Sequence, residues 1–223
     1  MTNELATPGR SLFPEYPRIP RMYAEEVEGL TDAQLDRIRP EKSWGHWSIR
    51  TQVSHAASVC YRWFLLRWGT VLFGNNLPRD KSLTETGGAD RILDPARFHD
   101  MPVLLAALKD ACDLIWDILE RETLGSMREK EIVNRLQKAP RGPLKEDVRE
   151  WRENVTLKIH PSGVWVDPND PDLTHCNLEY TFRHVLWECY AHLKTIQMHK
   201  KAEGLTPSVQ IPYIGYLTIL TWE

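Results

Sequence analysis

Hydrophobic residues recur at helical spacing over two long stretches in the middle of the chain. From Ile49 to Val71 the apolar positions return every three or four residues, and Ser48 stands where an N-cap is expected. A second amphipathic stretch begins at Pro102, a residue tolerated in the first turn of a helix, and continues to Glu122. The pattern therefore predicts two long helices that each bury one face.

Similar patterns near the two ends of the chain predict two more principal helices. The first covers about 20–30 and is followed by a short helix in which Thr31 and Gln34 have the form of a capping box. The last covers about 173–202, with Gly204 as its C-cap. Four such helices with one shared core predict a mainly α protein, an antiparallel four-helix bundle.

Between and after these helices lie segments that do not belong to a bundle. We expect a single domain over 1–223, with insertions at about 75–100 and 123–172. Within the second insertion, alternation around the turn residues HPSG predicts a small β-hairpin over 155–166. The apolar tail, 205–223, has β character, so it must pack on the domain or on a second chain.

Composition is ordinary for a soluble globular protein. The 223 residues are 42% hydrophobic and 26% charged, and the net charge is −3. Because Lys and Arg are not clustered in the sequence, nucleic acid is not expected as a partner. No apolar stretch is long enough for a membrane span, and the N-terminus lacks the apolar core of a signal peptide. We therefore expect a cytoplasmic protein with no membrane partner.

Cysteine and tryptophan add little chemistry by themselves. The cysteines show no CxxC pairing, which favours a reducing compartment and a role as small buried hydrophobes. Most of the tryptophans are expected in the core. The residues concerned are Cys60, Cys112, Cys176 and Cys189, and Trp63, Trp68, Trp116 and Trp187.

Candidate chemistry appears on the last predicted helix, where His184, Glu188 and His192 follow one another at four-residue spacing among aliphatic residues. Four residues advance a helix by about 400° and about 6 Å, so Glu188 and His192 can reach the same metal ion. A third ligand must come from elsewhere, and His55, in the middle of an apolar helix, is the best candidate.

Two histidines and one glutamate form a ligand set of the kind that catalytic zinc sites use, with a fourth position open to water or substrate. Imidazole also suits nickel and iron, so the residues do not identify the divalent metal. The order differs from the HExxH motif of zinc proteases. Without a metal, Glu188 and His192 would be a surface pair worth about 0.3 kcal/mol, and His55 a hydrogen-bonded core histidine.

Three further residues are candidates for supporting roles. His184 can orient a ligand or carry a proton, or it is simply a hydrogen-bonded core imidazole. Arg62 and Gln52 can face a cavity and meet an anionic substrate, or they lie on a solvated helix face.

Four aromatic residues outside the ligand set lie in segments that could contact it. His160 and Trp165 lie on the predicted hairpin, which forms either a lid over the metal or a surface hairpin with one aromatic packed down. Before the His55 helix, Trp47 is expected to pack in the structure and His46 to be exposed.

Two short segments resemble the signatures of the DinB/YfiT-like family. The segment SWGHWSIRTQVSHAA, 43–57, resembles the first signature, and ECYAHLKTI, 188–196, resembles the second. The resemblance covers about 15–73, 101–122 and 173–203, but not the insertions or the tail. It implies an up-down-down-up four-helix bundle that holds a divalent metal with three side chains.

The family's ligand positions fall on His55, Glu188 and His192. The middle position is usually histidine in the family, and a glutamate there is similar to the mycothiol-dependent maleylpyruvate isomerase branch. The resemblance therefore implies a metal-dependent enzyme that activates a low-molecular-weight thiol, or water, for transfer, isomerisation or addition on a small electrophilic substrate. A metal-dependent hydrolase and a non-catalytic metal-binding or interaction protein are the alternatives, and a homodimer is expected.

Overall fold

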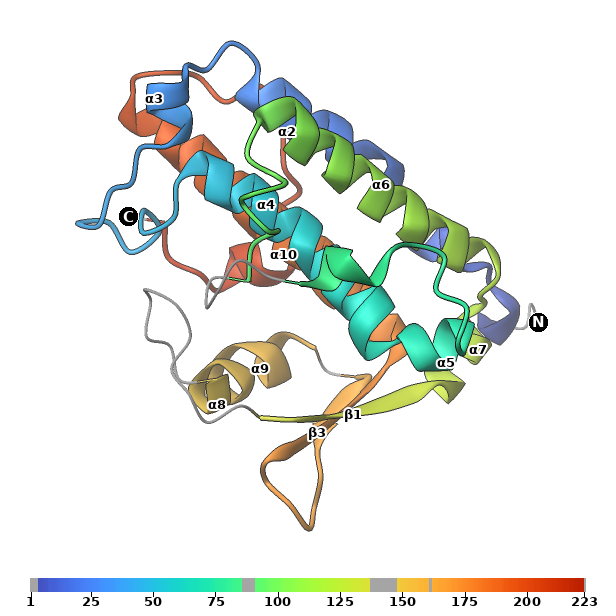
Figure 1. Ribbon diagram of the computed structural model, residues 1–223. Coiled ribbons are helices and arrows are strands. Elements are labelled where there is room, and N and C mark those ends of the chain that lie inside the picture. Colours follow the sequence, from blue (N-terminus) through green and yellow to red (C-terminus); the bar gives the residue numbers. More distant parts are fainter. Residues whose placement is uncertain (1–3, 86–90, 137–147, 161, 223) are drawn as a thin grey trace.

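Four helices lie side by side at the centre of the molecule (Figure 1), and the computed structural model describes residues 4–85, 91–136, 148–160 and 162–222. In Figure 1 the first and last helices run towards the upper left and the two middle ones towards the lower right, which is the up-down-down-up order. The helices are α2 (Ile19–Val27), α4 (Ile49–Tyr61), α6 (Met101–Glu120) and α10 (Leu178–Ala202).

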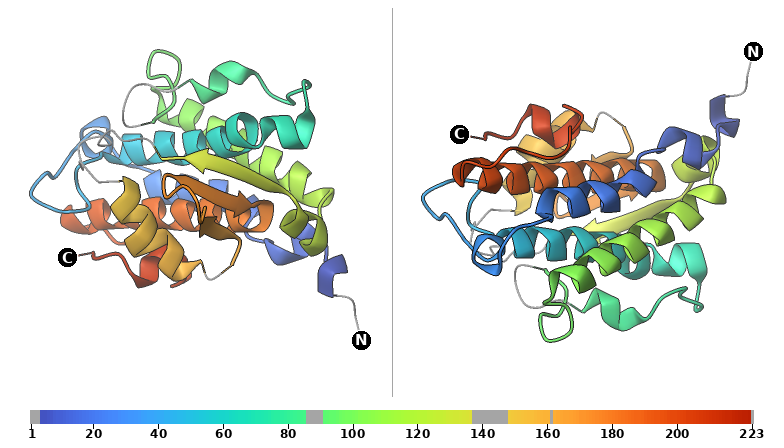
Figure 2. Two further views of the ribbon diagram at one scale, coloured as in Figure 1. Left: turned by 90° about the horizontal axis from the view of Figure 1, so that it is seen from below. Right: turned by 90° about the horizontal axis from the view of Figure 1, so that it is seen from above.

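The four helices form a closed ring around one core. α2 and α4 each pack against both α6 and α10, and the two views in Figure 2 agree with this arrangement. The interior contains several large, fully buried side chains, among them Tyr16, Tyr23, Phe64, Trp68 and Phe182. The predicted mainly α four-helix bundle is confirmed.

Local sequence signals explain where these helices begin and end. Ser48 Oγ accepts a hydrogen bond from the Thr51 amide at 3.2 Å and so caps α4. The Thr31 capping box is present at the start of α3 (Asp32–Leu35). After α10, Gly204 has φ +76°, a conformation that glycine adopts without steric cost.

The helix predicted from Ser48 onwards is interrupted rather than continuous. After α4 the chain forms a π-helix, η3 (Arg62–Arg67), and then α5 (Gly69–Phe73). The Trp68 amide accordingly bonds to the Trp63 carbonyl, five residues back, at 3.0 Å. The wider turn brings Arg62 and Arg67, which are also five residues apart, towards the same side of the helix. Apolar periodicity did not reveal this change because both helix types bury one face.

The predicted β-hairpin over 155–166 is wrong. Its first half is helical, in η5 (Arg152–Thr156) and α9 (Leu157–Ile159), and only its second half forms a strand, β2 (Val164–Val166). The helical conformation is explained by burial, because Arg152, Thr156 and His160 are buried at four-residue intervals and so share one face.

The true partner of β2 is β3 (Leu173–Asn177), with Trp165 opposite His175. β1 (Glu131–Arg135) pairs with the other edge of β3, so the small antiparallel sheet has the order β1-β3-β2. The predicted last helix therefore begins five residues later than expected, at Leu178, where Asn177 Oδ1 caps it by accepting from the Tyr180 amide at 2.8 Å. Figure 1 shows the sheet on one side of the bundle.

The apolar tail packs on its own domain and contains no strand in the described residues. A buried carboxylate fixes its beginning: Glu26 accepts hydrogen bonds from Lys200 Nζ at 2.8 Å and from the amides of Ser208 and Val209 at 2.9 Å. Further on, the short 3-10 helix η6 (Gly215–Thr218) buries Tyr216 against α10. Side-chain anchoring thus replaces the strand pairing that the apolar pattern suggested.

The remaining elements are short. Within the predicted insertions and tail, 86–90, 137–147, Pro161 and Glu223 lie outside the described residues. No helix in the described ranges is both long and apolar enough to cross a membrane. The short elements are η1 (Glu4–Ala6), α1 (Gly9–Leu12), η2 (Tyr16–Arg18), η4 (Lys81–Thr84), α7 (Leu124–Glu129) and α8 (Val148–Trp151).

Candidate metal centre

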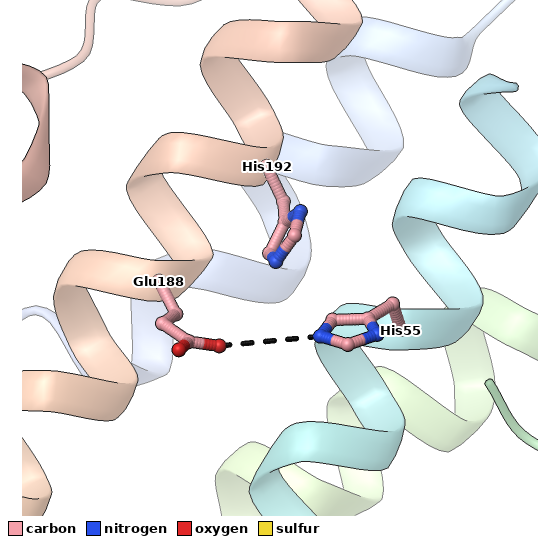
Figure 3. A group of neighbouring side chains, drawn as sticks. All are labelled: His55, Glu188 and His192. Carbon is pink, nitrogen blue, oxygen red and sulfur yellow. Dashed lines mark ion pairs between the residues drawn. The ribbon is translucent and has the colours of Figure 1, made fainter. Parts of the chain in front are cut away.

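The structure brings His55, Glu188 and His192 together in the space between α4 and α10. Figure 3 shows the three side chains pointing towards one another, one from α4 and two from α10. One potential ligand atom from each lies within 4.8 Å of the others, and His55 Nε2 is 4.0 Å from Glu188 Oε2. Two helices that are distant in sequence thus supply one compact set of donors.

This donor set fits a divalent metal. Two imidazoles and one carboxylate are ligands that zinc accepts, and three protein ligands leave a coordination position for a small molecule. Nickel and iron accept the same atoms. Across the described ranges no second group of three His, Cys, Asp or Glu donors comes this close together.

Gln52 holds His192 in the form that a metal needs. The Gln52 side-chain oxygen lies 2.6 Å from His192 Nδ1. A carbonyl oxygen can only accept, so Nδ1 carries the proton and Nε2 keeps its lone pair free for a metal. Burial lowers the pKa of His192, which further favours the neutral imidazole. Gln52 is itself buried and so does not lie on a solvated helix face.

Trp47 covers the two histidine ligand candidates. Its ring centroid lies 4.7 Å from that of His55 and 6.0 Å from that of His192, and it stacks on the latter. His199 Nε2 donates to the Trp47 carbonyl at 2.9 Å, while Arg39 donates to His199 Nδ1 at 2.7 Å. Trp47 therefore packs as predicted, but its packing partners are the site itself. His46, expected to be exposed, is half-buried.

A chain of hydrogen bonds from the C-terminal tail ends at His184, which lies beside Glu188. His184 Nε2 lies 3.3 Å from Glu188 Oε1, and His184 Nδ1 bonds to the Tyr216 hydroxyl. That hydroxyl is also 3.2 Å from His160 Nε2. Because a phenol has a single hydroxyl proton, Tyr216 donates to one of these two imidazoles and accepts from the other. Burial lowers the pKa of His184 to about 3, so this imidazole is neutral at physiological pH.

His160 and Trp165 do not form a lid. His160 is buried and stacks on Trp187 with ring centroids 4.5 Å apart, whereas Trp165 is exposed and stacks on His175. The surface-hairpin alternative is wrong for His160, because the segment that carries it is a buried helical face. Trp63 and Trp68 are buried as expected, while Trp116 and Trp187 are only partly buried.

A cavity of about 160 Å³ opens beside the candidate ligands His55 and Glu188. Its other lining residues come mainly from η3, the sheet, α8, η5 and the loop before α6. Sequence reasoning singled out only one of its arginines, Arg62, because the others lie in segments whose spatial proximity no local pattern reveals. Five arginines line the cavity: Arg62, Arg67, Arg91, Arg135 and Arg152.

The chain's own thiols are poorly suited to act as nucleophiles. All four cysteines are free and buried. Hydrogen bonding with Cys60 and burial raise the pKa of Cys189, and burial raises the pKa of Cys176, which lines the cavity, to about 12. A thiol that reacts at this site at neutral pH would therefore have to come from outside the protein.

Comparison with known proteins relates the fold to one solved structure. No family model matches the chain, and no curated protein is similar to it. YfiT from Bacillus subtilis, described as a probable metal-dependent hydrolase with an unusual four-helix bundle topology, superimposes with a TM-score of 0.51. The alignment covers 89% of each chain at 16% identity. The likeness confirms a DinB/YfiT-like fold, while the mycothiol-dependent branch stays a prediction.

Proposed function

We propose that this chain is a metal-dependent enzyme that activates a nucleophile for attack on a small electrophilic substrate. The observation that carries the proposal is the gathering of His55, Glu188 and His192 within 4.8 Å, at the wall of a cavity. Bound there, a divalent metal supplies the Lewis acidity that makes water or a thiol nucleophilic at neutral pH.

The surrounding residues prepare the ligand set for this task. Gln52 keeps the proton of His192 on Nδ1, and His184 Nε2 lies 3.3 Å from Glu188 Oε1, whereas His55 faces Oε2. Trp47 lies against both imidazoles and limits the access of water from its side. A site whose ligands are oriented before binding loses less conformational freedom when it is filled.

We infer that the nucleophile is a low-molecular-weight thiol, with water as the second candidate. The thiol follows from the His, Glu, His order of ligands, which is similar to the mycothiol-dependent branch, and from the inert state of the protein's own cysteines. Water is favoured by the description of YfiT as a probable hydrolase. In either case, the cavity beside the candidate ligands favours a small molecule as the substrate. Zinc is the first metal to test.

Turnover by metal-loaded protein, compared with chelator-treated protein, tests this function. One assay follows the consumption of small thiols in the presence of an activated electrophile, and a second follows the hydrolysis of activated esters without thiol. We expect metal-dependent turnover in one of the two assays and its loss in Glu188→Gln. Turnover that responds to metal in neither assay would contradict the proposed activity, and protein that still binds metal would then favour the non-catalytic metal-binding alternative. The expected homodimer is a separate prediction, which the mass from light scattering tests.

A further inference from the structure

The lining of the cavity beside the candidate ligands carries an excess of positive charge. Five guanidinium groups line it, and among its lining residues Glu188 provides the only carboxylate. Arginine stays protonated under all ordinary conditions, so these charges cannot be relieved by losing a proton. A divalent metal at the ligand set would add to the excess.

Local carboxylates balance only part of this charge. Arg135 pairs with Asp170 at 2.9 Å, and Arg152 pairs with Glu153, which is half exposed, at 3.1 Å. By contrast, within the described part of the chain no carboxylate lies within 4.0 Å of Arg67, whose guanidinium stacks 4.1 Å above the Trp63 ring.

The same holds for Arg91, in the loop before α6. Among the described residues no carboxylate is within ion-pair distance of it, and its Cα has φ +54°. Burial lowers the pKa of both Arg67 and Arg91, which reflects how poorly their charge is solvated there. Glu188 is the carboxylate that acts on both cations, and it does so from beyond ion-pair distance.

Hydrogen-bond donors at the cavity also lack acceptors. Arg152 is 5% exposed, and its buried Nε has no hydrogen-bond partner in the part of the chain that the structure describes. The buried Nη2 of Arg91 is likewise without a partner among the described residues. The rest of the Arg152 guanidinium is bonded within the chain, since Nη1 donates to the Pro171 carbonyl at 2.9 Å and to Thr174 Oγ1 at 3.1 Å. Leaving a buried charged donor unsatisfied is costly, so an acceptor that reaches these two side chains at the cavity would stabilise them.

We propose that this arginine wall binds an oxyanionic group, a carboxylate or a phosphate, on the substrate of the neighbouring metal centre. Guanidinium groups match the paired oxygens of both anions, and several donors around one cavity select for charge and shape together. A cavity of about 160 Å³ is of the size that accommodates a benzene-sized molecule. The anionic end would lie on the arginines while the reactive end faces His55 and Glu188.

This inference rests on the proposed function only in assigning the anion to a substrate, and the test keeps the two separate. Inorganic phosphate and succinate are titrated calorimetrically into metal-loaded and metal-free protein at constant ionic strength, with sodium chloride as the reference. The metal content of every sample is measured in parallel. We expect saturable binding of at least one of the two anions with and without metal. The anion with the higher affinity shows whether the site prefers a phosphate or a carboxylate.

Variants then locate the binding. Arg67→Gln and Arg91→Gln are each expected to weaken the anion about tenfold, the loss expected for one charge-assisted hydrogen bond. Arg21→Gln, on the exposed outer face of α2, serves as the matched control and should bind as wild type does. Circular dichroism identifies the variants that fold. If Arg67→Gln does not fold, the anion affinity of Arg91→Gln, a substitution in a loop, shows whether these arginines bind the anion.

Three results would overturn the proposal. One is that neither anion binds better than chloride, another is binding only when metal is present, and the third is folded arginine variants that bind as tightly as wild type. A protein that binds no metal but keeps arginine-dependent anion binding would instead refute the proposed function and leave the anion site standing.

Discussion

At the level of single side chains, the hydrogen bond from His192 to Gln52 decides whether the site is prepared for a metal. Replacing Gln52 by Leu removes the acceptor for Nδ1–H and leaves a buried donor unsatisfied. We expect the metal affinity to fall about 10- to 100-fold, as is typical when a partner of a metal-binding histidine is lost. Competition with a chromophoric chelator measures the affinity.

The conservative variant Gln52→Glu provides the control, because it keeps an oxygen that can accept from Nδ1. It should retain an affinity much closer to that of wild type. If Gln52→Leu binds metal as tightly as Gln52→Glu, then Gln52 does not orient His192.

At the residue level, the sequence could indicate which side chains lie close together where their chemistry follows helical spacing. Glu188 and His192 could be paired from their four-residue separation, and His55 from its position in an apolar helix together with the family resemblance. Gln52 is a candidate for a supporting role from the sequence alone, but its hydrogen bond to His192 could not be predicted, because α4 and α10 come together only in the tertiary structure. Tyr216 gave no local signal at all, since its contacts to His160 and His184 join segments far apart in sequence.

At the level of elements, the tail segment η6 is linked to the residues beside the candidate site through the hydroxyl group of Tyr216. Tyr216→Phe removes the oxygen that bonds to both His184 and His160. Two buried imidazoles then lose a partner, so we expect the free energy of unfolding to fall by about 1–3 kcal/mol. Urea denaturation measures this loss, and Tyr213→Phe, at a tyrosine that is 74% exposed, is the matched control. Equal stability of the two variants would contradict the account.

Docking of the tail also depends on one glycine. Gly215 has φ +56°, and a Cβ there would lie 2.1 Å from the Trp187 ring, whereas Gly204 has φ +76° with no atom within 4 Å of the same position. Both Gly→Ala variants suffer backbone strain of about 1 kcal/mol, but only Gly215→Ala adds a steric clash. We therefore expect Gly215→Ala to be clearly the less stable in urea denaturation. A loss no greater than that of Gly204→Ala would show that the tail adapts without cost.

Prediction of elements from the sequence was most accurate where one face is buried over many turns. The bundle helices and the Thr31 and Ser48 caps follow from periodicity and local hydrogen bonding. The 155–159 segment was misassigned because five residues alternate equally well as a strand or as part of a helix, and the true partner of β2 lies later in the chain. The π-helix η3 escaped notice because one additional residue in a turn leaves the apolar pattern almost unchanged.

At the level of the whole molecule, buried histidines couple folding to pH. Burial lowers the pKa of His160 to about 2, with Arg183 and His184 adding to the effect, and burial lowers the pKa of His199, which faces Arg39 and Glu203, to about 4. Both imidazoles are neutral in the folded protein but take up protons in the unfolded chain below about pH 6.5.

Because the unfolded state then binds more protons, the free energy of unfolding should fall as the pH drops below about 6.5. Each of the two histidines contributes up to about 1.4 kcal/mol per pH unit until the pH nears its folded pKa. Urea denaturation of metal-free protein at pH 7, 6 and 5 measures this slope, and His199→Gln should reduce it by about one proton. A stability that stays constant between pH 7 and 5 would contradict the prediction.

The arrangement of the whole molecule also explains why the cavity could not be predicted. Its arginines come from η3, from the loop before α6, from β1 and from η5, and only the packing of the sheet against the bundle unites them. The sequence shows these residues as scattered charges in a chain with a net charge of −3. Their gathering around one cavity is therefore a property of the tertiary structure.

The central claim is that His55, Glu188 and His192 hold one divalent metal, and metal stoichiometry tests it most directly. Wild type and the variants His55→Ala, Glu188→Gln and His192→Ala are dialysed against zinc, freed of excess metal and measured by elemental analysis. His99→Ala, at an exposed histidine, is the control. We predict about one zinc per chain in wild type and control and a loss of bound zinc in each ligand variant. A wild type without zinc, or ligand variants that retain it fully, would contradict the account.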